Sequence, residues 1–432
     1  MNSIQQLAAV CALGYAARLV LINYNTTNWL FNESTEFNTP PTSYNNLNEA
    51  IFLINNNLSP YNSNIYHNNI LYVYYMQFIQ TNCPSWQPHL YILIDMINGL
   101  LIYGITQHSS LTHDYSKLPL LNSAILILNP ITIIGCCIFN SASITHLFLL
   151  LATYTAIQHM LYTTSVVYAL LLYIDGPTST MILPPLLVIL SHTGQSNNIY
   201  VYKIVKRALW LIMSTSIVLI CVIYISYRLN NQSFDFINCH YIFGMYGAFN
   251  TQSTHNAYTY NHTPNIGVWW YFNAELFPRF RSFFQFVFHL HQYIYIIPLT
   301  IRFYQYPIFL LYSTVAVNTI FEPYPTLQDT VLMLVLLSVN QAIVMPYIRR
   351  IYLVTWLMCI NGVMLQLMRY LWLYAGSGNA NFYYFQTLLF AFTNCFVLIE
   401  AVTSVRKYIA SNHNPNNKLI RNTEQTINYE FS

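Results

Sequence analysis

The feature that most constrains this chain is a series of apolar segments, each about as long as a bilayer is thick, which recurs from the N-terminus to residue 405. A membrane-spanning helix needs about 20 such residues. Only 7% of the 432 residues are charged, whereas an ordinary soluble domain carries about 25%. With 55% hydrophobic residues, the sequence predicts an all-α, polytopic membrane protein.

Turns, prolines and polar loops divide the apolar segments into about twelve expected transmembrane helices. Asn129-Pro130 and Pro184-Pro185 mark points where a helix must kink or end, because proline interrupts the backbone hydrogen-bond ladder. Residues 47–58 show helical spacing, and residues 68–79 are a candidate for a further, half-inserted helix. The expected spans cover residues 4–22, 88–107, 119–139, 142–156, 158–174, 179–192, 208–227, 283–301, 306–321, 331–347, 351–373 and 382–405.

Lysine and arginine gather in the loops that this count places on one side of the membrane, and the positive-inside rule assigns that side to the cytosol. The sequence therefore predicts one multi-span domain, residues 1–432, with both termini cytosolic. Residues 23–87 form the first lumenal loop, residues 228–282 the second, and residues 406–432 a cytosolic tail. The cytosolic basic residues are Lys203, Lys206, Arg207, Arg302, Arg349, Arg350, Arg406, Lys407, Lys418 and Arg421.

The first lumenal loop carries three triplets of the N-glycosylation type, which begin at Asn25, Asn32 and Asn57. Such triplets also arise by chance in an Asn-rich chain, so glycosylation at each position stays open. Their shared location agrees with a lumenal loop.

The second lumenal loop runs into an aromatic stretch at residues 263–284, TPNIGVWWYFNAELFPRFRSFF. Trp269, Trp270 and Tyr271 lie close to one acid, Glu275, and two arginines follow. Trp and Tyr rings favour the headgroup layer, where the ring is apolar and its N–H or O–H group stays wet. The stretch predicts a helix in the membrane surface that faces a ligand there. An aromatic anchoring belt without a ligand is the alternative.

A second informative stretch is YAGSGNANF, residues 374–382. Its glycines interrupt the helical pattern at the lumenal end of a span, and Asn379 and Asn381 then offer amide groups at headgroup depth. A tight turn between two spans also explains the glycines. The two asparagines are therefore candidates for hydrogen bonding to a polar ligand.

Multi-span lipid-linked sugar transferases of the GT-C type resemble this architecture, and they carry an acidic base, usually aspartate, in the first lumenal loop. That loop has no aspartate here, so only Glu33 or Glu36 can substitute, and a lone loop glutamate is usually solvated. No two lumenal acids form a motif. These acids are Glu33, Glu36, Glu49, Asp175, Asp235, Glu275, Glu322 and Asp329.

The sequence predicts no metal and no cofactor. His289 and His291 are two positions apart and face different sides of a helix, which favours packing over metal binding. The eight cysteines lack CxxC spacing, and only Cys239, beside His240, has a polar context. The net charge of +3 is too small and too dispersed for a nucleic-acid partner.

Five short stretches, in order along the chain, resemble the PIG-U family, the multi-span U subunits of the GPI transamidase complex. The chain departs from that family in a shorter cytosolic loop at residues 107–119 and in a more Asn-rich first lumenal loop. The stretches are Ser59-Pro60-Tyr61 with Tyr66-His67; Leu128-Asn129-Pro130; Thr263-Pro264-Asn265-Ile266-Gly267 with Trp270-Tyr271-Phe272 and Glu275; Tyr324-Pro325-Thr326 with Asp329; and Tyr374-Ala375-Gly376-Ser377 with Asn379, Asn381 and Phe382.

This resemblance implies a non-catalytic subunit in the endoplasmic reticulum membrane. In that family's complex, a caspase-like cysteine protease subunit cleaves the C-terminal signal of a proprotein and transfers the acyl group to the ethanolamine amine of GPI. The U subunit is expected to help hold the GPI lipid, and the C-terminal signal is a further candidate ligand. Two alternatives stay open, a lipid-linked mannosyltransferase and a purely structural scaffold. The expected lipid-binding residues are Asn379 and Asn381 as a polar rim, and Trp269, Trp270, Tyr271 and Glu275 as a shelf at headgroup depth.

Overall fold

The computed structural model describes residues 3–24, 31, 34–63, 65–108, 117–191, 201–230, 232–237 and 263–413. Every regular element in these ranges is a helix, which confirms the predicted all-α class. The chain divides into two compact units, residues 1–339 and 340–432, and each is described by itself.

The first unit begins with α1 (Ser3–Tyr24), which lies against α5 (Trp86–His108), α6 (Leu118–Ile127) and α7 (Pro130–Cys137). The side chain of Asn129 accepts a hydrogen bond from the Ile131 N–H group, and Pro130 occupies the first turn of α7. As a result, α6 and α7 meet at an angle of 44°. The break expected at Asn129-Pro130 is confirmed.

Two glycines allow α1 and α5 to approach α6 closely, because both face Ile127. A Cβ atom at Gly14 would lie 2.2 Å from Ile127 Cγ2, and one at Gly99 would lie 2.4 Å from Ile127 Cδ1. Neither distance leaves room for a side chain. The apolar contact between these three helices therefore depends on glycine at both positions.

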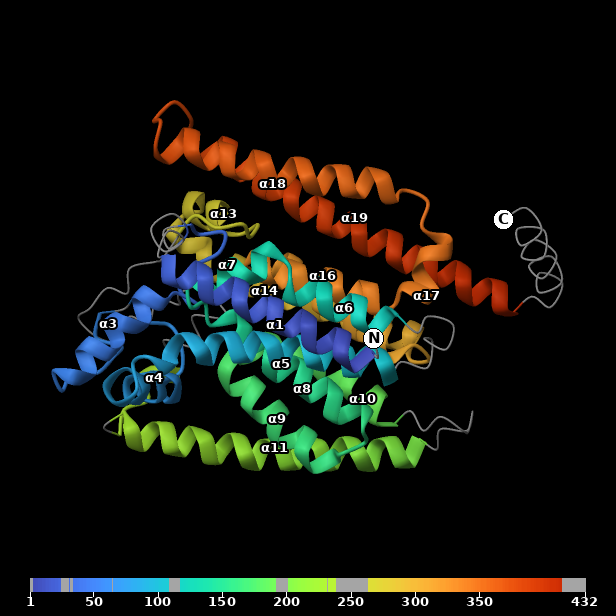
Figure 1. Ribbon diagram of the computed structural model, residues 1–432, viewed down its shortest axis with the longest axis horizontal. Coiled ribbons are helices and arrows are strands. Elements are labelled where there is room, and N and C mark those ends of the chain that lie inside the picture. The colour runs from blue at the N-terminus through green and yellow to red at the C-terminus, as the bar shows by residue number, and fades with distance from the viewer. Residues whose placement is uncertain are drawn as a thin grey trace. The chain divides into compact units, whose positions relative to one another are not determined.

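The next four helices are α8 (Ala142–Ile157), α9 (Leu161–Asp175), α10 (Leu183–Ser191) and α11 (Val201–Leu229). In Figure 1, α9 packs against α8 and α11 as neighbouring green and yellow-green helices. A 3-10 segment, η1 (Gly176–Ile182), joins α9 to α10, and Gly176 has the positive φ of 75° that glycine tolerates. This turn ends α9 at Asp175.

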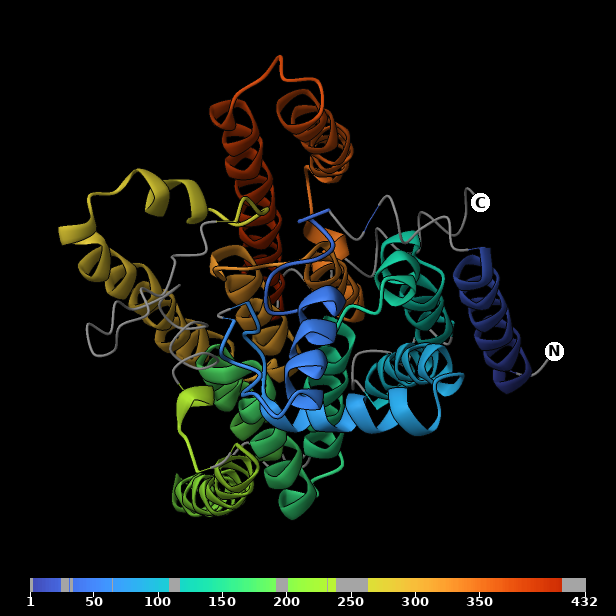
Figure 2. The same ribbon diagram turned by 90° about the vertical axis from the view of Figure 1, so that its left-hand side faces the viewer.

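The aromatic stretch forms two helices instead of the single surface helix expected from its sequence. The first, α13, covers only Trp270–Glu275, and α14 begins at Pro278 and continues to Phe303. Phe277 between them is extended, with ψ of 136°, because a residue before proline avoids the helical region. Figure 2 shows the chain, in yellow, turning between the two helices.

The first unit ends with α15 (Pro307–Phe321) and α16 (Leu327–Val339), and α15 packs against both α14 and α16. The predicted first lumenal loop contains two helices, α3 (Tyr44–Asn55) and α4 (Ile70–Asn82). They bury Leu47, Ile70 and Met76 in a core shared with α5.

Two backbone hydrogen bonds fix the described part of the first loop above the starts of two later helices. The Ser141 N–H group donates to the Thr42 carbonyl at 3.3 Å, just before α8. The Leu327 N–H group donates to the Glu36 carbonyl at 3.0 Å, at the start of α16. The loop therefore lies over the ends of α8 and α16 that meet the candidate site described below.

The second unit contains α17 (Gln341–Val344), η3 (Met345–Tyr347), α18 (Ile351–Leu373) and α19 (Ala380–His413). Figures 1 and 2 both show α18 and α19 side by side, in orange and red, as an antiparallel hairpin. Asn361 of α18 donates from its Nδ2 atom to Thr393 Oγ1 of α19 at 2.6 Å. This buried hydrogen bond sets the register of the hairpin.

Five of the described helices are long and apolar enough to cross a membrane, namely α1, α5, α11, α18 and α19, and the number is seven if two broken helix pairs each count as one. The predicted span over residues 331–347 is interrupted, because α16 ends at Val339 and α17 begins at Gln341, and the two helices together are long and apolar enough for one broken span. Asn340 between them leaves the helical region with ψ of 16°. Several expected spans, such as α8, α9 and α15, are apolar but short. The count of twelve stays a prediction.

Candidate functional site

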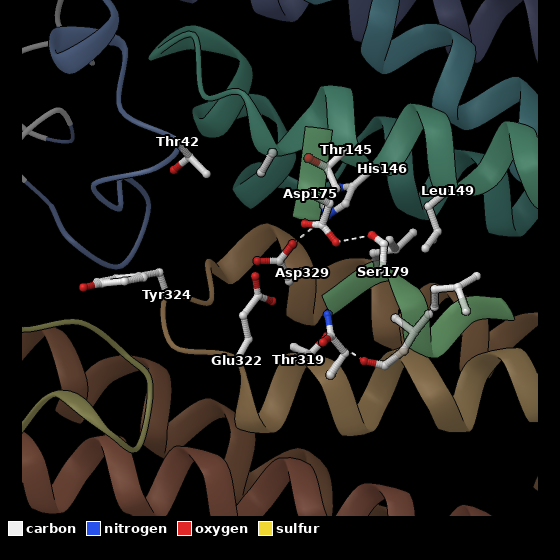
Figure 3. Close-up of a pocket in the computed structure, with 15 residues that line it drawn as sticks. Thr42, Thr145, His146, Leu149, Asp175, Ser179, Thr319, Glu322, Tyr324 and Asp329 are labelled. Carbon is white, nitrogen blue, oxygen red and sulfur yellow. Dashed lines mark hydrogen bonds and ion pairs between the residues drawn. The ribbon is translucent and has the colours of Figure 1, made fainter. Parts of the chain in front are cut away.

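A cavity of about 70 Å³ lies in the first unit between α8, α9, α15 and α16. Three carboxylates and one histidine line it, and Figure 3 shows these side chains pointing toward one another. Thr42 of the first loop also lines the cavity. The sequence predicts that the helix ends which supply the carboxylates lie on the lumenal side. The histidine and the three carboxylates are His146, Asp175, Glu322 and Asp329.

His146 and Asp329 form a hydrogen bond across this cavity. His146 Nε2 lies 2.7 Å from Asp329 Oδ1, and the two residues are 183 positions apart in the sequence. The second oxygen of Asp329 accepts hydrogen bonds from Thr326, one from the backbone N–H group and one from the hydroxyl, each at 2.7 Å. Thr326 and Asp329 thus stand three residues apart at the start of α16, as in a helix capping box. Asp329 is fixed both by its own helix start and by α8.

Asp175 is the last residue of α9. Its Oδ2 atom accepts a hydrogen bond from Thr178 Oγ1 at 2.9 Å and a second from the Ser179 hydroxyl. Both donors belong to η1, so the turn after α9 holds the carboxylate in place. The second oxygen of Asp175 has no hydrogen bond or ion pair within the described ranges.

Glu322 follows α15 directly, and its carboxylate has no hydrogen bond or ion pair among the residues that the structure describes. Burial raises the pKa of Glu322 well above its usual value, and the nearby Asp329 and Asp175 carboxylates raise it further. Asn318, one turn earlier on α15, also lines the cavity, and its Oδ1 atom is shielded from solvent without a hydrogen-bond donor. The cavity therefore holds hydrogen-bond acceptors that the chain itself leaves unpaired.

A smaller cavity of about 10 Å³ lies next to the first, and both are lined by His146 and Leu332. Its wall contains a fully buried ion pair, in which Arg18 Nε of α1 lies 3.1 Å from Asp95 Oδ2 of α5. Asn98 and Gln328 also line it, and they are 4% and 2% exposed. Asn98 Oδ1 and Gln328 Oε1 have no hydrogen-bond donor within the described part of the chain.

The predicted aromatic shelf belongs to the first unit. Trp269 is half-buried, donates from Nε1 to the Phe321 carbonyl at 2.8 Å and stacks on Phe288 with ring centroids 4.3 Å apart. Trp270 is buried at 6% exposure. Trp269 and Trp270 therefore pack against the unit, which leaves less of each ring for a ligand than the sequence alone suggests.

Tyr271 and Glu275 are the more accessible members of the shelf, one half-buried and the other exposed. Desolvation and the neighbouring Glu275 carboxylate raise the pKa of Tyr271. These two side chains lie one helical turn apart on α13 and interact with each other.

The predicted polar rim belongs to the second unit, in the turn between α18 and α19. Asn379 and Asn381 are both exposed. Asn379 Oδ1 accepts a hydrogen bond from the Phe382 N–H group at 3.3 Å, so this residue caps the start of α19. Asn381 makes no hydrogen bond among the described residues. Gly376 has a φ of 62°, and a Cβ atom there would meet nothing within 4 Å, so glycine serves the turn conformation.

The rim and the shelf lie in different units, so their use as one site stays a prediction. Sequence reasoning missed the cavity carboxylates as a group, although it placed Asp175, Glu322 and Asp329 individually on the lumenal side. Each sits at an end of an apolar helix, and that shared position was the available signal.

Glu36 differs from the expectation that a loop glutamate is solvated. It is fully buried, and the Ser34 hydroxyl donates to its carboxylate at 2.5 Å. Glu33, Cys239 and His240 lie outside the described residues.

His291 packs edge-on against Phe321 with ring centroids 4.6 Å apart. Within the described ranges, no group of three or more His, Cys, Asp or Glu residues has an arrangement suited to a metal ion.

Comparison with known proteins shows similarity over nearly the whole chain. The family model described as GPI transamidase subunit PIG-U matches residues 12–390. The mouse protein named GPI-anchor transamidase component PIGU is 26% identical over 413 residues, which cover 89% of this chain and 90% of the relative. GPI transamidase component GAB1 of Saccharomyces cerevisiae is 26% identical over 414 residues, which cover 94% and 97%.

Proposed function

Because the chain belongs to the PIG-U family of GPI transamidase subunits, we propose that it is a non-catalytic membrane subunit of a GPI transamidase complex and helps to bind the GPI lipid. The observation that carries this proposal is the family match over residues 12–390, which includes both the aromatic shelf and the polar rim. The mouse and yeast relatives are named as transamidase components, and the alignments with this chain cover 90% and 97% of their lengths. None of these names favours a lipid-linked mannosyltransferase.

The proposal places the chain in the endoplasmic reticulum membrane, with about twelve spans on a GT-C-like architecture and both termini in the cytosol. Its partners are a caspase-like catalytic subunit and companion membrane and lumenal subunits. The C-terminal signal of the proprotein is a second candidate ligand.

The exposed turn between α18 and α19 supports a lipid-headgroup role. Asn381 has an uncommitted amide, and Asn379 uses its side-chain oxygen for the α19 cap while its Nδ2 group remains available to donate. Donors of this kind suit phosphate and sugar oxygens. Hydrogen bonds to charged groups contribute about 1.5–3 kcal/mol each.

The test replaces the amides without removing the cap. In cells that lack the endogenous subunit, the double variant Asn379→Ser, Asn381→Ala should lower surface display of a GPI-anchored reporter by about tenfold or more. Serine at position 379 still caps the helix, so α19 should form normally. Flow cytometry measures the reporter, and affinity purification measures whether the partner subunits still bind.

The matched control is Asn45→Ala, which removes an exposed amide on α3. It should leave reporter display unchanged. Normal display with the double variant would remove both asparagines from the site. A loss of partner subunits together with display would instead favour a structural scaffold.

A further inference from the structure

We propose that the cavity between α8, α9, α15 and α16 binds a primary ammonium group. The ligand is the –CH2–NH3+ end of an aminoethyl or amino-sugar compound, held by Glu322, Asp175 and the Asn318 amide oxygen.

The first step is the balance of donors and acceptors around the cavity. Asp329 uses both oxygens for His146 and Thr326, and Asp175 uses one oxygen for Thr178 and Ser179. The remaining groups, the Glu322 carboxylate, the free oxygen of Asp175 and Asn318 Oδ1, are all acceptors without donors within the described chain. An ammonium group supplies three N–H donors and one positive charge, which matches this set.

The second step is independent of the carboxylates. The smaller cavity, which His146 also lines, is bordered by the buried side chains Asn98 and Gln328, and Asn98 Oδ1 and Gln328 Oε1 have no donor in the described chain. Unpaired buried acceptors are uncommon because each costs about 1–3 kcal/mol. Together with Asn318 Oδ1, they make the region around His146 rich in acceptors without donors in the described chain, which favours a species that carries several donors.

The third step is the size and charge of the ligand. A cavity of about 70 Å³ is several times the roughly 10–15 Å³ that one water molecule requires, so a –CH2–NH3+ group fits in it. A trimethylammonium group is larger and has no N–H donors. A divalent metal fits less well, because the described residues contain no arrangement of three or more ligands that suits one.

Access to the cavity is open, since Asp175, Glu322 and Asp329 are each half-buried and not sealed. On the predicted topology these residues lie at lumenal helix ends, where lipid headgroups are found. Two sources share the required chemistry, the amines of a GPI lipid and the headgroup of phosphatidylethanolamine. The choice of GPI as a source rests on the proposed function, whereas the ammonium chemistry does not.

The experiment measures lipid retention by the complex that contains the full chain. The complex is placed in nanodiscs that contain equal amounts of phosphatidylethanolamine, its N,N-dimethyl derivative and phosphatidylcholine, and native mass spectrometry counts the lipids that stay bound. The wild-type complex should retain phosphatidylethanolamine over phosphatidylcholine by about tenfold, with the dimethyl lipid between them. Glu322→Gln and Asp175→Asn should each lower that preference toward one.

Glu322→Gln is the decisive variant, because Glu322 has no partner in the described chain whose loss would disturb folding. The control is Asp235→Asn, which neutralises an exposed carboxylate elsewhere in the first unit and should keep the preference. Mass spectrometry of lipids that co-purify from cells identifies GPI or phosphatidylethanolamine as the source, and either supports the ammonium site if Glu322→Gln loses it.

Equal retention of all three lipids by the wild-type complex would overturn the proposal, as would a stoichiometric divalent metal that Glu322→Gln releases. The reporter assay for Asn379 and Asn381 is separate from this measurement. If the cavity shows no preference while those variants still lower GPI attachment, this inference fails and the proposed function stands.

Discussion

Two polar groups in the first unit both lie among apolar helices, and they differ in how their charge is compensated. Arg18 is fully buried and its Nε atom lies 3.1 Å from Asp95 Oδ2, while Nη1 donates to the Gly14 and Ile127 carbonyls and Nη2 to the Thr132 hydroxyl. Glu322 has no partner in the described chain, although burial raises its pKa. The first arrangement is complete within the protein, whereas the second is complete only with a ligand or a proton.

This difference separates a structural polar group from a candidate binding group. A buried charge that loses its partner costs several kcal/mol, so a paired residue such as Arg18 is held by the fold itself. An unpaired acceptor at an accessible position costs less, and it is retained where something outside the chain satisfies it. Substitutions at the two places should therefore have opposite effects on stability.

The largest effect is expected for Arg18→Met, which leaves the buried Asp95 without its oppositely charged partner. We expect a loss of about 3–5 kcal/mol in the free energy of unfolding. Thermal unfolding of the purified complex, followed by size-exclusion chromatography, gives the measurement. The double variant Arg18→Met, Asp95→Leu should recover much of this loss. If it is as unstable as the single variant, the ion pair is not what holds α1 against α5.

An intermediate effect is expected for Asp329→Ala, which removes the His146 pair and both hydrogen bonds from Thr326. We expect a loss of about 1–3 kcal/mol. Thr326→Ala removes only the cap and should cost about 1 kcal/mol. The same unfolding assay compares the two. Equal losses would show that the His146 contact adds nothing to stability.

The smallest effect, and one of opposite sign, is expected for Glu322→Gln. The pKa of Glu322 is raised in the folded state, so its protonated form is the favoured one and stability is lost as the pH rises through that value. Without an amine lipid, the variant and the wild type should therefore unfold at the same temperature at about pH 4. At about pH 8 the variant should unfold at a higher temperature than the wild type.

Adding phosphatidylethanolamine at pH 8 should stabilise the wild-type complex and not Glu322→Gln, because a ligand that binds only the folded state raises its stability. If the variant melts at the same temperature as the wild type at every pH, the Glu322 carboxylate does not destabilise the folded state. That result would place it with Arg18 as a satisfied residue.

Much of the helical layout was predictable because it depends on local pattern. The prediction of a helix over residues 351–373 coincides with α18, and that over residues 88–107 differs from α5 by two residues at one end and one at the other. Length and apolarity decide such helices, and Asn-Pro or a proline decides where they break. The interruption at Asn340 within residues 331–347 was not predicted, since a single polar residue in an apolar run carries little signal.

The shelf was harder to predict, because aromatic content shows that a segment prefers an interface and not which ring is covered. Trp270 is buried and Trp269 is committed to Phe321 and Phe288, while Glu275 remains exposed. Which face of a short helix packs inward depends on the neighbouring helices α14 and α15.

The helical class, the apolar segments and the similarity to the PIG-U family can be read from the sequence, because hydrophobic segment length and short motifs are local properties. Which polar residues meet depends on how the helices pack in three dimensions. Arg18 finds Asp95 across 77 positions and His146 finds Asp329 across 183, and helix packing alone brings them together. The same packing leaves Glu322 without a partner in the described chain. The strength of an electrostatic contact depends on distance and burial in space and not on separation along the chain, so the sequence does not show which acids are paired.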